Sequence, residues 1–289
     1  MLISQNIGML YELRDLKTIL NIIKKAGFDA YDYSMTTDHG ETDKYVNIFT
    51  MDDYVDKAKE LKEYADSIGL ICNQAHAIFP SFFKGNEERT EQGIKDAIKC
   101  MEIASILGAK VIVVHPENNC RAKENSLYYK RLEPYCEKFN IKIGVENMWN
   151  WDDVNHKVVS AACAYPDDFK ETIELLNPKW FTCCVDIGHA EMMEGMSAKE
   201  LLLTLGSYVG ALHIHDNDKY LDRHMIPFSG KINFDEIIDA LKEINYQGDI
   251  TLEVLNFLNY FPLDEESYQI GTNMMYNAAK RIYDKFNEK

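Results

Sequence analysis

The sequence predicts a closed parallel (β/α)8 TIM barrel, and three observations support this fold class. Short apolar, β-branched runs alternate with longer amphipathic stretches along all 289 residues, with no linker or low-complexity tract between them. Eight such strand–helix units suit the length of a closed barrel. The glycine-rich phosphate loop that follows the first strand of an open doubly wound sheet is missing, so that sheet is only the alternative. We therefore expect residues 1–289 to form one domain.

Strands are expected where β-branched and aromatic residues form short runs. The predicted ranges are about 2–8, 28–33, 69–76, 110–115, 141–147, 180–186, 209–214 and 249–255. Between them, apolar residues recur at three- and four-residue spacing, as from Ile94 to Leu107, and indicate helices. Asn233 followed by Glu236 is typical of a capping box before a helix at 234–244. Left-handed helix caps are expected at Gly27, Gly69, Gly108 and Gly248.

Composition and charge exclude several classes of protein. The 47 acidic and 31 basic residues give a net charge of −16, which disfavours broad contact with nucleic acid or an anionic membrane. There is no apolar run long enough to span a bilayer, and MLISQNIGMLYELRD does not resemble a signal peptide. Seven cysteines, none in a CxxC motif, favour free thiols and a reducing, cytoplasmic location. Cys184 is expected to be a small buried hydrophobe.

Ionisable residues cluster at the ends of the predicted strands, where a barrel places its active site. These residues are His76, His115, Glu146, Asp186, His189, His213, His215 and Glu253. Alternate residues of a strand share a face, so the three carboxylates Glu146, Asp186 and Glu253 are expected to point into one cavity.

Several carboxylates buried together resist ionisation unless a cation accompanies them. A single strand-end histidine is more often a hydrogen-bonded structural residue. Three carboxylates with several imidazoles, however, favour a divalent metal centre. Mixed Asp, Glu and His ligands suit Mn²⁺ or Zn²⁺ first, and Co²⁺, Mg²⁺ or Fe²⁺ next.

Aromatic residues follow two of these strand ends. Trp149 and Trp151 lie in a predicted loop after Glu146, where they either cover the apolar face of a sugar or pack the loop. Three phenylalanines follow His76: Phe79, Phe82 and Phe83. They are expected either to form a hydrophobic wall beside the site or simply to pack in the core.

The stretches ALHIHDN, DRHMIPFSGKINFDEIIDALKEINYQGDITLEV and VIVVHPENN resemble the xylose isomerase-like TIM-barrel superfamily, especially its sugar-phosphate isomerase/epimerase branch. The resemblance covers nearly the whole chain and is most specific over 141–255. Its similarity to ketose 3-epimerases implies one divalent metal held by Glu146, Asp186, His213 and Glu253. It also implies a substrate contact by His189, a sugar or polyol substrate, and a homo-oligomer. Those enzymes place an arginine where this chain has Asp218 and Lys219.

The sequence Asp222-Arg223-His224 also resembles endonuclease IV. Nine residues fall where that family has ligands of a three-zinc cluster: His76, His115, Glu146, Asp186, His189, His213, Asp222, His224 and Glu253. His76, His115, His189, Asp222 and His224 therefore either form a second metal site or line a sugar pocket. The loop SMTTDHGETDKYV carries three acids and one lysine, with Asp38, Glu41 and Asp43 expected in solvent, which disfavours DNA as the substrate.

The expected activity is that of a metal-dependent isomerase or epimerase (EC 5-type) in carbohydrate metabolism. Glu146 and Glu253 are the expected acid–base residues, and an enediolate is the expected intermediate. Substrate contacts are assigned to His76, His115, His189 and Trp149, and a substrate phosphate, if present, to Arg223 or Lys231. The alternatives are a zinc-dependent phosphodiesterase acting at abasic DNA, an inosose-type dehydratase and a non-catalytic sugar-binding protein.

Overall fold

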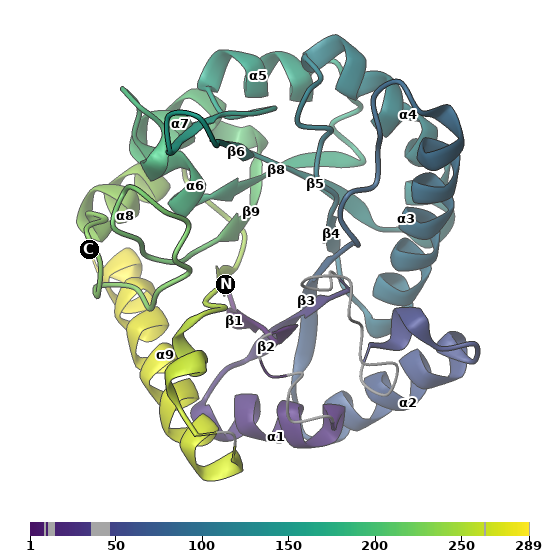
Figure 1. Cartoon of the computed structure of the whole chain (residues 1–289). Helices are drawn as coiled ribbons and strands as arrows, with labels where there is room; N and C mark the ends of the chain where they lie inside the picture. Colours follow the sequence, from purple (N-terminus) through teal and green to yellow (C-terminus); the bar gives the residue numbers. More distant parts are fainter. Residues whose placement is uncertain (9, 11–14, 36–46, 263, 289) are drawn as a thin grey trace.

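Eight parallel strands form a barrel in the computed structural model, which describes residues 1–8, 10, 15–35, 47–262 and 264–288 (Figure 1). In sheet order the strands are β10 (Ile250–Leu252), β1 (Ile3–Asn6), β2 (Ala30–Ser34), β3 (Ile71–His76), β4 (Val111–Val113), β5 (Lys142–Glu146), β8 (Phe181–Asp186) and β9 (Val209–His213). The first and last strands of the chain pair directly. Between β9 and β10, the amide of Ile214 donates to Thr251 and the amide of Glu253 donates to Ile214, each at 3.0 Å, which closes the barrel. The predicted fold class is confirmed.

Helices follow the strands and cover the outside of the barrel (Figure 1). They are α1 (Leu16–Ala26), α2 (Tyr54–Ser67), α3 (Glu87–Leu107), α4 (Ala122–Phe139), α5 (Pro166–Glu174), α6 (Ile187–Met192), α7 (Ala198–Leu205), α8 (Phe234–Glu243) and α9 (Glu265–Asn287). Short 3₁₀ turns lie at Ile48–Thr50, Gly206–Tyr208 and Phe257–Tyr260. Within the described ranges, none of these helices has both the length and the apolar composition needed to cross a bilayer.

Three of the four predicted glycine caps are confirmed. Gly27, Gly69 and Gly108 have positive φ angles of 111°, 68° and 93°. The prediction at Gly248 is wrong, because α8 ends earlier and Asn245 takes the left-handed conformation at φ 53°. The capping box before α8 is also absent, because the Asn233 side chain caps no backbone amide of the helix. Its side-chain NH₂ group donates to the Glu236 carboxylate at 2.7 Å.

Strand alternation separates two packing regions. Outward residues such as Ile143, Val145 and Cys183 belong to the main core beneath the helices. Inside the lumen, Val113, Cys184 and Ala211 form a small apolar cluster with Val111. Burial raises the pKa of Cys184 to about 12, which fits the neutral, buried thiol expected there. All seven cysteines are buried and free.

The segment after β5 differs from the prediction. Instead of a loop, an antiparallel hairpin is formed by β6 (Trp149–Asp152) and β7 (Lys157–Ser160), with Trp149 paired to Ser160. The hairpin lies at the carboxyl ends of the barrel strands and so borders the region where ionisable side chains gather.

Candidate metal centre

The carboxyl ends of four strands bring together two glutamates, an aspartate and a histidine. Glu146 ends β5, Asp186 ends β8, His213 ends β9 and Glu253 follows β10, and all four side chains are buried. One ligand atom from each lies within 4.8 Å of the others. His213 Nδ1 is 2.9 Å from Glu146 Oε1 and 3.5 Å from Glu253 Oε2. We refer to these four residues as the central group.

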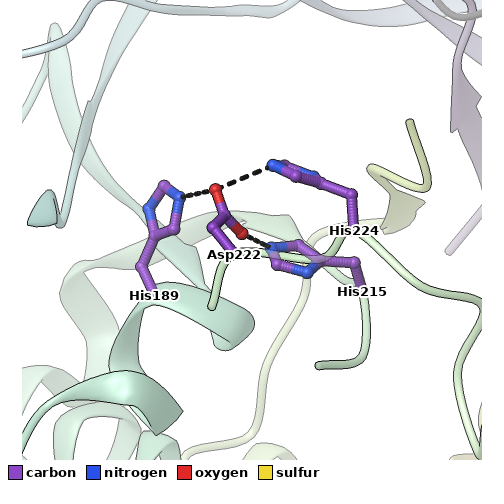
Figure 2. Close-up of side chains that lie close together, drawn as sticks. All are labelled: His189, His215, Asp222 and His224. Carbon is purple, nitrogen blue, oxygen red and sulfur yellow. Dashed lines mark hydrogen bonds and ion pairs between the residues drawn. The ribbon is translucent and has the colours of Figure 1, made fainter. Parts of the chain in front are cut away.

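A second set of possible ligands is centred on one carboxylate, as Figure 2 shows. Asp222 Oδ2 is 3.3 Å from His189 Nε2 and 3.0 Å from His224 Nε2. Asp222 Oδ1 is 3.6 Å from His215 Nε2. The rings of His215 and His224 stack with their centroids 4.1 Å apart. We refer to His189, His215, Asp222 and His224 as the histidine group; its ligand atoms also lie within 4.8 Å of one another.

His215 connects the two groups. Its Nε2 atom is 3.1 Å from Asp186 Oδ1 in the central group and faces Asp222 in the histidine group. The ring fits only because residue 188 is a glycine: a Cβ atom there would lie 1.9 Å from His215 Cε1. The two groups are therefore neighbouring parts of one polar basin.

His76 and His115 lie elsewhere in this basin. His115 Nε2 is 3.0 Å from Glu146 Oε2, and His76 Nδ1 is 3.3 Å from Glu253 Oε1. Together with Glu146 they form a third possible ligand set. The five residues predicted as one second metal site are thus divided. His189, Asp222 and His224 share the histidine group, whereas His76 and His115 sit beside Glu146.

Imidazoles lower the pKa values of Glu146 and Asp222 in the basin. Burial would raise the pKa of Glu146, but His213 and His115 outweigh it and hold the pKa well below its usual range. Burial would also raise the pKa of Asp222, but His224 and His189 outweigh this effect and hold the pKa well below its usual value. Burial would lower the pKa of His224, but the neighbouring Asp222 carboxylate outweighs burial and raises this pKa to about 10. Protonated His224 thus offsets the negative charge of Asp222.

The side chains of the basin have the chemistry needed to hold a divalent cation. Carboxylate oxygens and imidazole nitrogens are ligands of Zn²⁺ and Mn²⁺. Asp222 Oδ1 is buried without a hydrogen-bond partner among the described residues, although a carboxylate oxygen is a strong acceptor. A cation would satisfy that oxygen and replace the protons that neutralise the carboxylates.

Asn147 fixes the geometry next to both groups. Its side-chain amide donates to the carbonyl of Asp186 at 2.9 Å, and its Oδ1 accepts from the amide of Asp186 at 2.8 Å. Its backbone carbonyl is 2.9 Å from His189 Nδ1. These contacts leave His189 Nε2 facing Asp222.

Two aromatic side chains border the basin. Trp149 Nε1 donates to Asp222 Oδ2 at 3.3 Å, and its ring meets the His189 ring edge-on. Phe79 meets His115 edge-on at a centroid distance of 4.7 Å and is 43% exposed. Phe82, by contrast, is buried against the aromatic side chains of α4, and Phe83 lies under Arg89.

Two of the three cations near the mouth, Lys219 and Arg223, are engaged by carboxylates. Lys219 Nζ is 2.7 Å from Glu191 Oε2, and Arg223 Nε is 3.2 Å from Asp218 Oδ2. Lys231 is exposed, and its backbone amide donates to Asn217. The acidic residues Asp38, Glu41 and Asp43 lie outside the described residues.

The sequence analysis assigned no role to two members of the basin. His215 was noted at its strand end but given no function, and Asp32 was not considered. Both obey the same alternation as the residues that were selected: His215 lies two residues after His213, and Asp32 lies between Tyr31 and Tyr33, which pack in the outer core. Applying the alternation of inward and outward residues to β2 would have identified Asp32.

Residues 20–277 match the family described as Xylose isomerase-like TIM barrel. The chain is 33% identical over 178 residues to uncharacterized protein MJ1311 of Methanocaldococcus jannaschii, covering 58% of this chain and 57% of that protein. It is 26% identical over 201 residues to uncharacterized protein y4fM of Sinorhizobium fredii, covering 65% and 60%. The chain therefore spans less than two thirds of the length of these relatives. L-ribulose-5-phosphate 3-epimerase UlaE of Salmonella heidelberg is 23% identical over 248 residues, covering 81% of this chain and 80% of that protein.

Solved structures share the fold along nearly the whole chain. A D-tagatose 3-epimerase-like protein superposes with a TM-score of 0.74 at 23% identity and covers 99% of both chains. The IolI protein with a bound zinc atom superposes with a TM-score of 0.73 at 20% identity, covering 99% of this chain and 98% of that one. Because the family match extends over most of its length, this chain belongs to the xylose isomerase-like TIM-barrel family.

Proposed function

We propose that the protein is a divalent-metal-dependent isomerase or epimerase that acts on a sugar or polyol by proton transfer. The observation that carries this proposal is the central group, in which Glu146 and Glu253 meet Asp186 and His213 at the mouth of the barrel. The names of UlaE and of the D-tagatose 3-epimerase-like protein support a sugar substrate, since both name sugar 3-epimerases.

The central group would hold the ion, with Asp186 and His213 as anchors and the two glutamates completing the set. Zn²⁺ or Mn²⁺ suits these ligands, and the zinc atom in the IolI structure supports this choice. A bound divalent cation would supply Lewis-acid polarisation of a substrate carbonyl and stabilise the negative charge that develops on its oxygen.

Glu146 and Glu253 would transfer the proton. They come from strands separated by β8 and β9 around the barrel, so their carboxylates approach a substrate from different directions. Both are held ionised because the neighbouring imidazoles outweigh burial and lower their pKa values, so either can accept a proton from carbon. Removal by one and return by the other would invert the carbon, whereas a single base would give isomerisation.

The surrounding side chains would bind and shield the substrate. His189, which lies 3.7 Å from Glu146, would hydrogen-bond a substrate oxygen, and His76 and His115 lie beside the two glutamates. Trp149 and Phe79 offer apolar surface that would exclude water from the basin. The histidine group would act as a polar pocket that can also take a second ion.

A second candidate is a zinc-dependent phosphodiesterase acting at abasic DNA. The specific observation in its favour is that four overlapping ligand sets lie side by side: the central group, the histidine group, His76 with His115 and Glu146, and Asp32 with His76 and His213. The net charge of −16 opposes a nucleic-acid substrate.

Deuterium exchange separates the two candidates. The protein is purified without a chelating tag, its ions are counted, and it is incubated with a panel of ketoses in D₂O. Carbon-bound deuterium in one ketose, with about one ion per chain, is the expected result. No exchange with any ketose, together with about three zinc ions and cleavage of an abasic duplex, would replace the proposal with the phosphodiesterase.

A further inference from the structure

We infer that Asp32 is a positioning residue that orients His213, so that Nδ1 of the imidazole faces the proposed ion and Nε2 faces Asp32. Asp32 lies on β2, is fully buried, and points into the lumen beside the central group. Its Oδ2 atom is 3.7 Å from His213 Nε2. The inference rests on the proposed function, because it assigns His213 as a ligand.

The carboxylate of Asp32 lacks a full set of partners. Its Oδ2 atom accepts from the side-chain amides of Asn6 at 3.2 Å and Gln74 at 3.5 Å. Its Oδ1 atom is buried with no hydrogen-bond partner among the described residues. Buried polar atoms are normally paired, and a buried carboxylate is costly when only neutral amides solvate it. A further donor is therefore expected next to Asp32.

His213 supplies the matching donor. Its Nε2 atom is also buried without a hydrogen-bond partner in the described chain, and it faces Asp32. The separation of 3.7 Å from Asp32 Oδ2 is longer than a normal hydrogen bond, but it places the carboxylate next to the buried Nε2. A buried donor without a partner therefore lies beside a buried carboxylate that has too few donors.

The other ring nitrogen faces the acids of the central group. His213 Nδ1 is 2.9 Å from Glu146 Oε1 and 3.5 Å from Glu253 Oε2. A nitrogen that binds a cation must present its lone pair, so the ring proton has to be on Nε2. Histidine ligands commonly donate this second N–H to a carboxylate or carbonyl, which fixes the orientation of the ring.

Two histidines of the histidine group show the same arrangement with the nitrogens exchanged. His189 Nδ1 lies 2.9 Å from the carbonyl of Asn147, and His224 Nδ1 lies 2.8 Å from the carbonyl of Glu253. In both residues Nε2 then faces Asp222. His213 is reversed and is oriented by a carboxylate, which is a stronger acceptor than a carbonyl.

The test is the zinc affinity of the Asp32→Asn variant. An amide keeps the shape of the side chain, but it can present an NH₂ group to Nε2 and so favour the wrong ring tautomer. We expect zinc binding, measured by competition with a chromophoric chelator, to weaken about 10- to 100-fold. The matched control is Asp249→Asn. Asp249 accepts from the amides of Leu2 at 2.7 Å and Asn73 at 3.1 Å, away from the central group, so its loss should lower stability and leave zinc affinity unchanged.

A second measurement keeps the inference testable if the variant does not fold. Nitrogen-15 NMR of the wild-type imidazoles should show a slowly exchanging proton on Nε2 of His213, with and without zinc. A proton on Nδ1 of His213 in the zinc-loaded protein, or an Nε2 proton that exchanges rapidly in either state, would overturn the inference. If the wild type binds zinc and Asp32→Asn binds it equally well, the inference fails while the proposed ion site stands. If the wild type binds no zinc, the proposed function fails, and the NMR result alone decides the role of Asp32.

Discussion

Two successive layers of inward-pointing residues in the same strands have opposite chemistry. The lower layer is small and apolar and consists of Val113, Gly144, Cys184 and Ala211. The upper layer lies two residues further along each strand and consists of His115, Glu146, Asp186 and His213. The change from packed floor to ionisable basin therefore takes one step of strand alternation.

The lower layer has a consequence for the upper one. A Cβ atom on Gly144 would lie 3.2 Å from Val111 Cγ1 and 3.3 Å from Cys184 Cβ, so neighbouring side chains already fill the lumen there. Because the lower layer is filled with apolar side chains, water cannot reach the basin through the lumen. Charges interact more strongly where water is excluded. The floor thus supports the basin electrostatically, and substitutions in the two layers should have different effects.

The largest expected effect comes from Glu253→Gln in the upper layer. The amide cannot accept a proton from carbon, so deuterium exchange into the ketose should fall by roughly 10²–10⁴-fold. The measurement is made at saturating metal, because the substitution also weakens an ion ligand.

The control for this variant is Glu133→Gln. Glu133 accepts from Asn177 at 2.7 Å on the outside of the barrel, and its loss should leave exchange unchanged. If Glu253→Gln folds, binds the ion and retains exchange, Glu253 is not the base.

A smaller effect is expected from Gly188→Ala, which acts on the link between the two groups. The added Cβ would lie 1.9 Å from His215 Cε1, so the ring has to leave Asp186 and Asp222. We expect a loss of stability of about 1–3 kcal/mol from overpacking. Any ion in the histidine group should be lost, while the ion in the central group is retained. Thermal unfolding and ion counting measure both outcomes.

Gly144→Ala is the matched control in the lower layer. Its added methyl group would lie 3.2 Å from Val111 Cγ1 and 3.3 Å from Cys184 Cβ, tight contacts that shifts of a few tenths of an ångström relieve, so neither metal count nor exchange should change. Loss of the central ion in Gly144→Ala but not in Gly188→Ala would contradict the separation of the two layers.

Alternation within strands explains why much of the site could be predicted. Glu146, Asp186 and Glu253 each follow a short apolar run, and the period of two places them inside once the strand is recognised. The same rule places the outward partners Ile143 and Val145 in the core. Local pattern and barrel geometry together were sufficient for the fold and for this convergence.

The division of the histidines could not be predicted in this way. His189 and Asp222 lie outside the barrel strands, and their meeting depends on how α6 and the chain after β9 fold over the mouth. Likewise, the hairpin that brings Trp149 to Asp222 carries no strong turn signal in the sequence. Contacts between loops are fixed by tertiary packing, which sequence periodicity does not encode.

The smallest and most gradual effect is the pH dependence of the metal-free protein. Burial lowers the pKa of His76, but hydrogen bonds to Glu146 and Glu253 outweigh it and raise the pKa to about 9. The pKa of His224 is raised to about 10, because Asp222 outweighs burial. A pKa raised above the unfolded value of about 6.5 contributes stability that is complete below that pH and is lost as the pH rises through the folded value.

The chelated protein should therefore lose thermal stability between about pH 7 and pH 10, whereas zinc binding should strengthen as these imidazoles lose their protons. The gap in melting temperature between zinc-loaded and chelated protein should widen with pH. Asp222→Asn removes the partner of His224, so the chelated variant should show a smaller loss at the alkaline end. A chelated wild type whose melting temperature stays level across this range would show that protonated His76 and His224 do not neutralise the acids of the basin. The buried acids would then need another source of positive charge even without the ion.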